Sequence, residues 1–289
     1  MSWVLGSIGE PAGRRAAALA AAFSDGGRPV THRPLDEPAD EALRAERVTL
    51  VLEPAAPGLG DSPFPPLAVL KRGDARDALL VGPEHLAIVA AELAADPGAF
   101  NPADPLRSVR TGARLATDGS LRMTQVARLR PDLALEPMPS LSEALDRLDD
   151  SLDALVVPGH VADEVDPALV RRHLDPPWLG SPGDGVFWLR GPWREDLREA
   201  LLPLDDKPSR VEVTAELALA DTLGAEGLGA RARARHARLE MHALVLDGER
   251  MTTVHRTGEA TVRGALRLAM IVSRELAEAH GLTLPEVAS

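Results

Sequence analysis

Short apolar runs alternate along the chain with longer stretches in which apolar residues recur at helical spacing. The short runs predict strands at residues 3–8, 48–52, 67–70, 77–81, 114–116, 133–135, 154–157 and 185–190. The longer stretches predict helices at residues 11–23, 84–95, 120–129, 140–148, 194–202 and 208–223. Strands that alternate with helices indicate an α/β protein whose parallel sheets carry helices on both faces.

Residues at the ends of these stretches support the predicted helices. Gly26 and Gly27 follow the first helix, and Pro131 stops the helix at 120–129 because proline interrupts helical hydrogen bonding. Ser140 is followed three residues later by Glu143, which is the pattern of a capping box at a helix start.

The last third of the chain has a different pattern. Two runs, residues 235–246 and 251–257, flank Asp247-Gly248, a strong signal for a β-hairpin. A final helix is predicted at residues 261–280, where Gly281 ends it. The last third of the chain is therefore predicted to form a small α+β module.

Composition narrows the class of protein. The 289 residues are 45% hydrophobic but only 3% aromatic, so two or three modules would have cores of Ala, Leu and Val. A net charge of −12 argues against nucleic-acid binding. No window reaches the ~18 apolar residues of a membrane span, and residues 1–11 lack a secretion-signal pattern. We therefore expect a cytoplasmic protein with no nucleic-acid or membrane partner.

Several stretches resemble the hydroxymethylbilane synthase (porphobilinogen deaminase) family, in the family's own order. Asp118 to Leu133, DGSLRMTQVARLRPDL, is similar to a family helix that ends in Arg-Pro-Asp-Leu. The other matching stretches are residues 5–7 with the Ala-rich helix after them, residues 67–80, residues 152–157 and residues 201–223 with their Val-Thr-Ala-Glu. Together these fragments cover most of the chain.

The resemblance implies a fold and a division into domains. We expect two α/β lobes like the halves of a periplasmic binding protein, plus a small C-terminal α+β domain, with the active cleft between the lobes. The expected first lobe is residues 1–82 and 184–212, the second is residues 83–183, and the third domain is residues 213–289.

The resemblance also implies chemistry that this sequence lacks. The family needs a cysteine to anchor a dipyrromethane cofactor, an aspartate to stabilise positive charge on the pyrroles, and arginines to bind carboxylates. The chain has no cysteine, and so no cofactor is expected. The resemblance places Gly227 where the cysteine stands, Ala55 where the aspartate stands, and Met123, Met138 and Ala144 at arginine positions. Only Arg122 keeps its arginine.

Three hypotheses about function follow. The first is a non-catalytic or repurposed member that binds a small carboxylated ligand in the cleft or a protein partner. The second is an enzyme with new chemistry in the same cleft, for which Glu53, Asp118 and Asp184 are the catalytic candidates. The third is residual deaminase activity without a cysteine-linked cofactor. Oligomeric state and pathway stay open.

Candidate ligand-binding residues are Ser7, Arg114, Ser120, Arg122 and Arg231. Arg107, Arg110 and Arg114 precede the Ser120 helix, where an anion would meet the helix N-terminus. The alternative is an ordinary surface cluster. Arg231, Arg233 and Arg235 alternate with alanine and would share one strand face, an anion-binding stripe or, as we favour, a solvated surface.

Two further groups of residues, histidines and tryptophans, could bear on function. His236, His242 and His255 could meet across the hairpin, but no metal-ligand spacing is satisfied, so we predict no metal site. Trp178, Trp188 and Trp193 stand close in sequence, and we expect them to pack in the core rather than stack on a ligand.

Overall fold

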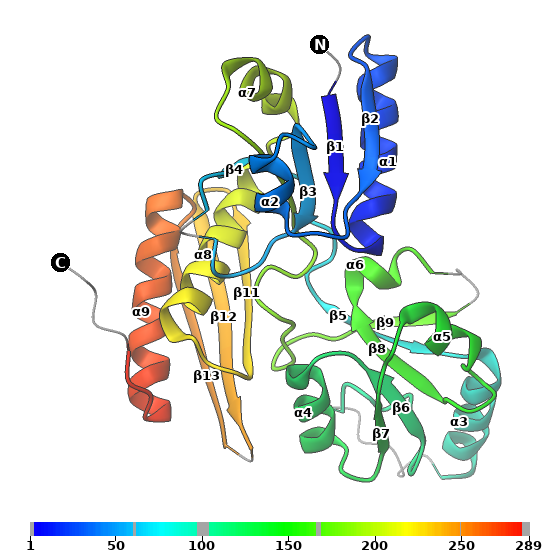
Figure 1. Cartoon of the computed structure of the whole chain (residues 1–289). Helices are drawn as coiled ribbons and strands as arrows, with labels where there is room; N and C mark the ends of the chain where they lie inside the picture. Colours follow the sequence, from blue (N-terminus) through cyan, green and yellow to red (C-terminus); the bar gives the residue numbers. More distant parts are fainter. Residues whose placement is uncertain (1–2, 60–61, 97–103, 166–168, 249, 285–289) are drawn as a thin grey trace.

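The structure is a computed structural model that describes all residues except 1–2, 60–61, 97–103, 166–168, 249 and 285–289. Its described residues form three sheets, each with its own helices (Figure 1). Two sheets have five strands and the third has three. The predicted fold class, two α/β lobes with a small α+β domain, is confirmed.

The first lobe is built on a sheet of order β2-β1-β3-β10-β4. Helices α1 and α7 pack on one face, and α2 and α8 pack on the other. The elements of this lobe are β1 (Trp3–Ser7), α1 (Glu10–Asp25), β2 (Val30–Pro34), α2 (Ala39–Arg44), β3 (Leu50–Pro54), β4 (Pro66–Val69), β10 (Phe187–Arg190), α7 (Glu195–Leu201) and the 3-10 turn η1 (Leu202–Leu204).

The second lobe is built on a sheet of order β7-β6-β8-β5-β9. Helix α4 packs on one face, and α5 and α6 pack on the other. The elements are β5 (Asp77–Val81), α3 (Pro83–Ala95), β6 (Arg114–Thr117), α4 (Ser120–Leu129), β7 (Ala134–Pro137), α5 (Leu141–Asp146), β8 (Ala154–Pro158), α6 (Gly159–Ala162) and β9 (Val170–His173).

The third domain is a three-stranded antiparallel meander with two helices on one face (Figure 1). Its core is almost entirely Ala, Leu, Val and Met, as the low aromatic content predicts. Side-chain caps start both helices, because Asp206 accepts from the Ser209 amide and Thr261 accepts from the Gly264 amide. The elements are α8 (Lys207–Leu223), β11 (Leu228–Arg235), β12 (Arg238–Asp247), β13 (Arg250–Glu259) and α9 (Val262–His280).

The expectation of purely parallel sheets is wrong. In each lobe four strands run in one direction and one strand opposes them: β10 is antiparallel to β3 and β4, and β5 is antiparallel to β8 and β9. Both antiparallel strands stand fourth in their sheet and follow a segment that crosses from the other lobe. The two lobes therefore share one topology: in each, the strand that follows the crossing segment runs antiparallel to the other four strands of its sheet.

The strand pairing also assigns β5 to the second sheet, although residues up to 82 were expected in the first lobe. Its hydrogen bonds to β8 and β9 are the reason. Helix α8 packs with one face on the third domain and with Val213 and Leu217 on the first lobe, so it lies across the proposed division at residue 213. The exact domain boundaries stay a prediction.

Most predicted elements are present within one to three residues of their expected ends. The capping box is confirmed, because Ser140 Oγ accepts from the Glu143 amide at 3.2 Å. The hairpin at Asp247 is confirmed by the β12–β13 pairing. The sequence patterns did not predict β2, α2, α6 and β9, all of six residues or fewer, and the eight-residue β11 was anticipated only through the alternating Arg231, Arg233 and Arg235. In the described part of the chain, no helix combines the length and the hydropathy needed to cross a membrane.

Candidate active site at the lobe junction

A small pocket lies where β1 of the first lobe ends and α1 begins. Ser7 is the last residue of β1 and is buried, and its Oγ lies 2.9 Å from Nε2 of His32 on the parallel neighbour β2. Gly9 and Gly13 contribute backbone to the pocket, which has a volume of about 350 Å³. Gly9 has a φ of +80°, which lets the chain turn sharply from strand to helix.

The surface exposed in this pocket is largely apolar, but several polar groups border it. The first-turn N–H groups of α1 have no intrahelical partners, as in any helix, and no side chain of the described residues caps them; the proline in this turn has no N–H to offer. The helix dipole is positive at the same end. Arg14, on the first turns of α1, also lines the pocket. The Ser7 hydroxyl and the His32 ring add groups that can donate a hydrogen bond.

Arg14 connects this pocket to the second lobe. Its Nε and Nη2 lie 3.0 and 2.5 Å from Oε2 of Glu164, which follows α6. Arg15 lies 3.7 Å from the same carboxylate and places its guanidinium over the Phe187 ring, 4.5 Å from the centroid. The two lobes are therefore bridged by an ion pair at the rim of the pocket.

A second group of polar residues surrounds Arg122 of α4 at the junction of the lobes. Its Nε donates to Oδ1 of the fully buried Asp77 at 2.9 Å, and its Nη1 donates to Asp118 at 3.0 Å. Its Nη2 donates to Asp184 on the segment that returns to the first lobe. Trp178 Nε1 donates to the other oxygen of Asp77 at 2.8 Å.

Three carboxylates thus share one guanidinium. Burial raises the pKa of Asp77 to about 6; Arg122 opposes this shift and the negative charge of Asp184 adds to it. Arg122 is fully engaged with aspartates, so an anionic ligand would have to displace one of them. This cluster brings together the predicted residues Arg122, Asp118 and Asp184, but it is a closed ion-pair cluster with an excess of negative charge.

Glu216 of the Val-Thr-Ala-Glu stretch forms a third buried polar group. Its two oxygens accept from Nη1 and Nη2 of Arg72 at 2.6 and 2.9 Å. They also accept from the Gly183 amide at 2.8 Å and the Ala232 amide at 2.6 Å. These partners come from both segments that cross between the lobes and from β11, so one carboxylate ties all three parts of the molecule together.

Other predicted site residues lie elsewhere. Glu53 accepts from Trp188 Nε1 at 3.2 Å and pairs with Arg190 at 2.5 Å, within the first lobe, so it does not meet Asp118. Arg114 starts β6 and Ser120 follows its end, so the predicted cluster of Arg114 with Arg122 is not formed.

Arg114 instead binds carboxylates at its own end of the sheet. Its amide donates to Asp153 at 2.7 Å and its side chain donates to Glu136 at 3.4 Å. Arg110 also bonds Asp153, at 3.0 Å. Arg110 and Arg114 therefore behave as an ordinary surface cluster, which is the alternative given for them from the sequence.

Ser120 and Arg231 line separate cavities. Ser120 faces Gly227 across a cavity of about 360 Å³ whose lining includes the carboxylates of Glu226 and Asp247. Arg231, half-buried on β11, lines a cavity of about 520 Å³ together with the crossing residues 71–76. Arg233 and Arg235 are exposed on the same strand face, as expected of a solvated surface.

The positions that the resemblance aligns with the family's chemistry have distinctive surroundings. Ala55 lies in an apolar cluster with Val186, Trp188 and other residues. Gly227 has a φ of +76°, and a Cβ built there would fall well inside van der Waals contact with the Leu246 carbonyl oxygen. Met138 and the fully buried Ala144 pack against the core beneath α5, and Met123 is half-buried on α4.

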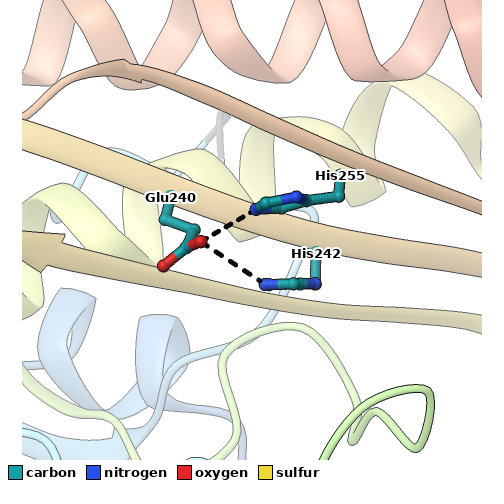
Figure 2. Close-up of side chains that lie close together, drawn as sticks. All are labelled: Glu240, His242 and His255. Carbon is teal, nitrogen blue, oxygen red and sulfur yellow. Dashed lines mark hydrogen bonds and ion pairs between the residues drawn. The ribbon is translucent and has the colours of Figure 1, made fainter.

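The tryptophans and histidines only partly follow expectation. Trp178 and Trp188 are buried, but Trp193 is 67% exposed, with Arg198 over its ring. His236 lies in the β11–β12 turn, apart from His242 and His255, which meet Glu240 instead (Figure 2).

The residues missed at the sequence level are His32, Asp77, His160 and Glu216. His32 lies on a strand too short and too polar to be recognised. Asp77 offered a usable signal, since it is a carboxylate at the start of an otherwise apolar strand. His160 packs edge-on against Phe187 across the lobe boundary, and burial lowers its pKa.

The fold and these junctions define a two-lobed α/β protein with a third domain at the lobe junction. The porphobilinogen deaminase of Roseiflexus castenholzii is 31% identical over 261 residues, which cover 85% of this chain and 78% of that protein. The porphobilinogen deaminase of Bordetella parapertussis is 30% identical over 209 residues, 68% of this chain and 60% of that protein. The chain therefore belongs to the porphobilinogen deaminase family.

Solved structures with similar folds share less sequence. The regulatory domain of OxyR2 from Vibrio vulnificus in its reduced form gives a TM-score of 0.43 at 11% identity, over 71% of this chain and 92% of that chain. An ancestral cationic amino acid solute-binding protein gives 0.43 at 11% identity, over 70% and 90%. No family model matches the chain.

Proposed function

We propose that this family member does not polymerise porphobilinogen and instead binds a small carboxylate-bearing ligand in a pocket of the first lobe that borders the second lobe. The observation that carries the proposal is the pocket at the N-terminus of α1, where Ser7, His32 and Arg14 meet beside an ion pair to the second lobe. A carboxylate there would meet first-turn amides, a guanidinium and two hydrogen-bonding side chains.

The lack of an anchor for the dipyrromethane cofactor supports the loss of polymerisation. The 289 residues contain no cysteine, so a thioether to the cofactor cannot form on this chain. Gly227, at the aligned position, has no room for any side chain because of the Leu246 carbonyl. The residues of this chain therefore do not fit the family's cofactor.

The lack of a catalytic acid supports the same conclusion. Ala55, at the aligned position, is 7% exposed and packs among Val69, Val186 and Trp188. Glu53, the acid closest in sequence, is held by Arg190 and Trp188. Removing one group that stabilises transition-state charge costs on the order of 3–4 kcal/mol, about a hundredfold or more in rate.

Polymerisation is tested by incubating the purified protein with porphobilinogen and following hydroxymethylbilane and the uroporphyrin that forms from it. The Roseiflexus castenholzii relative, assayed in parallel, is the positive control. We expect substrate to remain unchanged with this protein. Formation of either product above the no-enzyme rate would contradict the proposal and favour residual deaminase activity.

Ligand binding is tested by calorimetry with a panel of mono- and dicarboxylates, pyrrole carboxylates included. Because Arg14 is paired with Glu164, a ligand carboxylate competes with that glutamate. Arg14→Ala and His32→Ala should therefore weaken binding, and Glu164→Gln should strengthen it. Asp163→Asn, one residue away, is the matched control and should leave binding unchanged. If no carboxylate binds, the proposal fails and a protein partner becomes the better hypothesis.

A second candidate function is an enzyme with new chemistry, and one contact favours it. The 2.9 Å contact between Ser7 Oγ and His32 Nε2 is the geometry of a nucleophile beside its base. In an acyl transfer, His32 would take the hydroxyl proton while Oγ attacks the acyl carbon, and would then give that proton to the leaving group as its bond to the acyl carbon breaks. Labelling by a fluorophosphonate that is lost in Ser7→Ala and His32→Ala would support this candidate. Absence of labelling at high probe concentration would count against it.

A further inference from the structure

A compact group of metal-ligand side chains lies on the third domain, away from the lobe junction. His242 on β12 is directly opposite His255 on β13 in the antiparallel register. Glu240 lies two residues before His242 and so on the same face of the sheet. Figure 2 shows the three side chains converging from two strands on the face that the helices leave open.

The distances between donor atoms suit one metal ion. Oε1 of Glu240 lies 2.9 Å from Nε2 of His255 and 3.9 Å from Nε2 of His242. Ligand atoms of the three residues all lie within 4.8 Å of one another. Tetrahedral zinc, with bonds of 2.0–2.1 Å, spaces its ligands about 3.3 Å apart. Side-chain rotations at this exposed surface would bring the three donors to that spacing.

The backbone places the two imidazoles side by side before any ion binds. The strands beneath them belong to a continuous ten-residue ladder, which fixes the Cα positions of both residues. Their rings stack with centroids 4.0 Å apart and planes 13° from parallel, so at least one exposed ring must turn for both in-plane lone pairs to reach one ion. The strand pairing therefore lowers the ordering cost of the backbone, and the ring rotation is left for the ion to drive.

Arg231 and Arg233 on the adjacent strand share this face and repel cations, so the affinity will be lower than that of a closed structural site.

The donor types decide which ion the group would take. Two imidazole nitrogens and one carboxylate oxygen select borderline transition ions, whereas Mg²⁺ and Ca²⁺ prefer oxygen donors alone. With three protein ligands, the fourth position is left for water, because the three side chains are 30–48% exposed. We propose that Glu240, His242 and His255 form an open Zn²⁺ site that joins β12 to β13.

The site is tested on the full-length chain after removal of metals with EDTA. Zn²⁺ is titrated by calorimetry and in competition with a chromophoric chelator. We expect one ion per chain and a rise in melting temperature on adding Zn²⁺. Glu240→Gln, His242→Ala and His255→Ala should each weaken binding by at least about tenfold. Mg²⁺ at the same concentration should give no response.

His236→Ala is the matched control, since His236 lies in the turn of the same domain but outside the group. This variant should bind Zn²⁺ like the wild type. The proposal is overturned if the wild type binds no more tightly than the three ligand variants, or if His236→Ala loses as much affinity. Co²⁺ offers an independent readout: a visible d–d absorption in the wild type that His242→Ala and His255→Ala lack.

Discussion

The carboxylate of Glu216 receives both arms of the Arg72 guanidinium at 2.6 and 2.9 Å, and Glu216 has no exposed surface. Arg72 lies where the chain leaves the first lobe, and Glu216 lies on the helix shared between that lobe and the third domain. Amides of the returning segment and of β11 complete the coordination of this carboxylate. The relative placement of the three parts therefore depends on one buried ion pair.

Glu216→Ala is expected to destabilise the protein by about 3–5 kcal/mol, because it leaves the Arg72 charge buried without its partner. Chemical denaturation measures this loss. Arg72→Met combined with Glu216→Leu should recover much of it, since no charge remains to be desolvated. Glu212→Gln, whose carboxylate lies 3.7 Å from the same arginine, is the control and should cost far less. A mild effect of Glu216→Ala would refute the central role of this pair.

Stability should depend on pH through Asp77. Its pKa in the folded protein is raised from 3.8 to about 6, so between these values the folded state binds more protons than the unfolded state. The contribution of Asp77 to the free energy of unfolding is therefore largest below about pH 4, and it declines as the pH rises to about 6. Asp77→Asn should remove this decline. Across this pH range, the difference in the free energy of unfolding between wild type and variant should therefore change by on the order of 3 kcal/mol.

Denaturation midpoints between pH 4 and pH 7 measure this difference. Asp118→Asn is the matched control, since Asp118 bonds the same arginine but is 45% exposed. That variant should keep the pH dependence of the wild type. A parallel pH profile for wild type and Asp77→Asn would show that Asp77 does not titrate in this range.

Local patterns predicted much of the fold but little of the junction chemistry. Helix α4 was predicted with its correct ends because Gly119 and Pro131 bound an amphipathic run. Strand β2 was missed because Val30–Pro34 has a weak alternation and ends in proline. The antiparallel entry of β10 depends on the path of the chain between lobes, which no local pattern encodes.

The candidate site shows the same limit. Ser7 and Arg122 were recognised from their places in similar stretches, but their partners His32 and Asp77 are 25 and 45 residues away. Strand pairing brings Ser7 to His32, and a hydrogen bond between helix α4 and the start of β5 joins Arg122 to Asp77. A single sequence reveals neither contact. For His236, His242 and His255 no metal site was predicted, because spacing rules describe ligands on one local segment. Glu240 was not considered, and the hairpin register is what brings it beside His242 and His255.

The ion pair between Arg14 and Glu164 should hold the first two lobes together. Its side chains are 49% and 26% exposed, so its strength is about 1 kcal/mol or less. Glu164→Gln should therefore raise the ratio of molecules with separated lobes to molecules with joined lobes by up to about fivefold. Fluorescence energy transfer between dyes on the two lobes measures this change, and high salt should produce the same shift in the wild type. An unchanged transfer distribution in both conditions would exclude a role for this pair in closure.

The loop after α8 offers a direct test of whether one substitution can restore a cofactor anchor. Gly227→Cys places a Cβ against the Leu246 carbonyl at a φ of +76°, whereas Gly224→Cys in the same loop has a φ of +55° and open space around it. Both variants carry the backbone strain of a left-handed residue, of order 1–3 kcal/mol, but only Gly227→Cys adds the clash. We therefore expect Gly227→Cys to be the less stable of the two in chemical denaturation, and to form no porphobilinogen-derived adduct by mass spectrometry. Equal stability of the two variants, with an adduct on Gly227→Cys alone, would mean that the loop can adopt a conformation in which a cofactor thiol is accommodated.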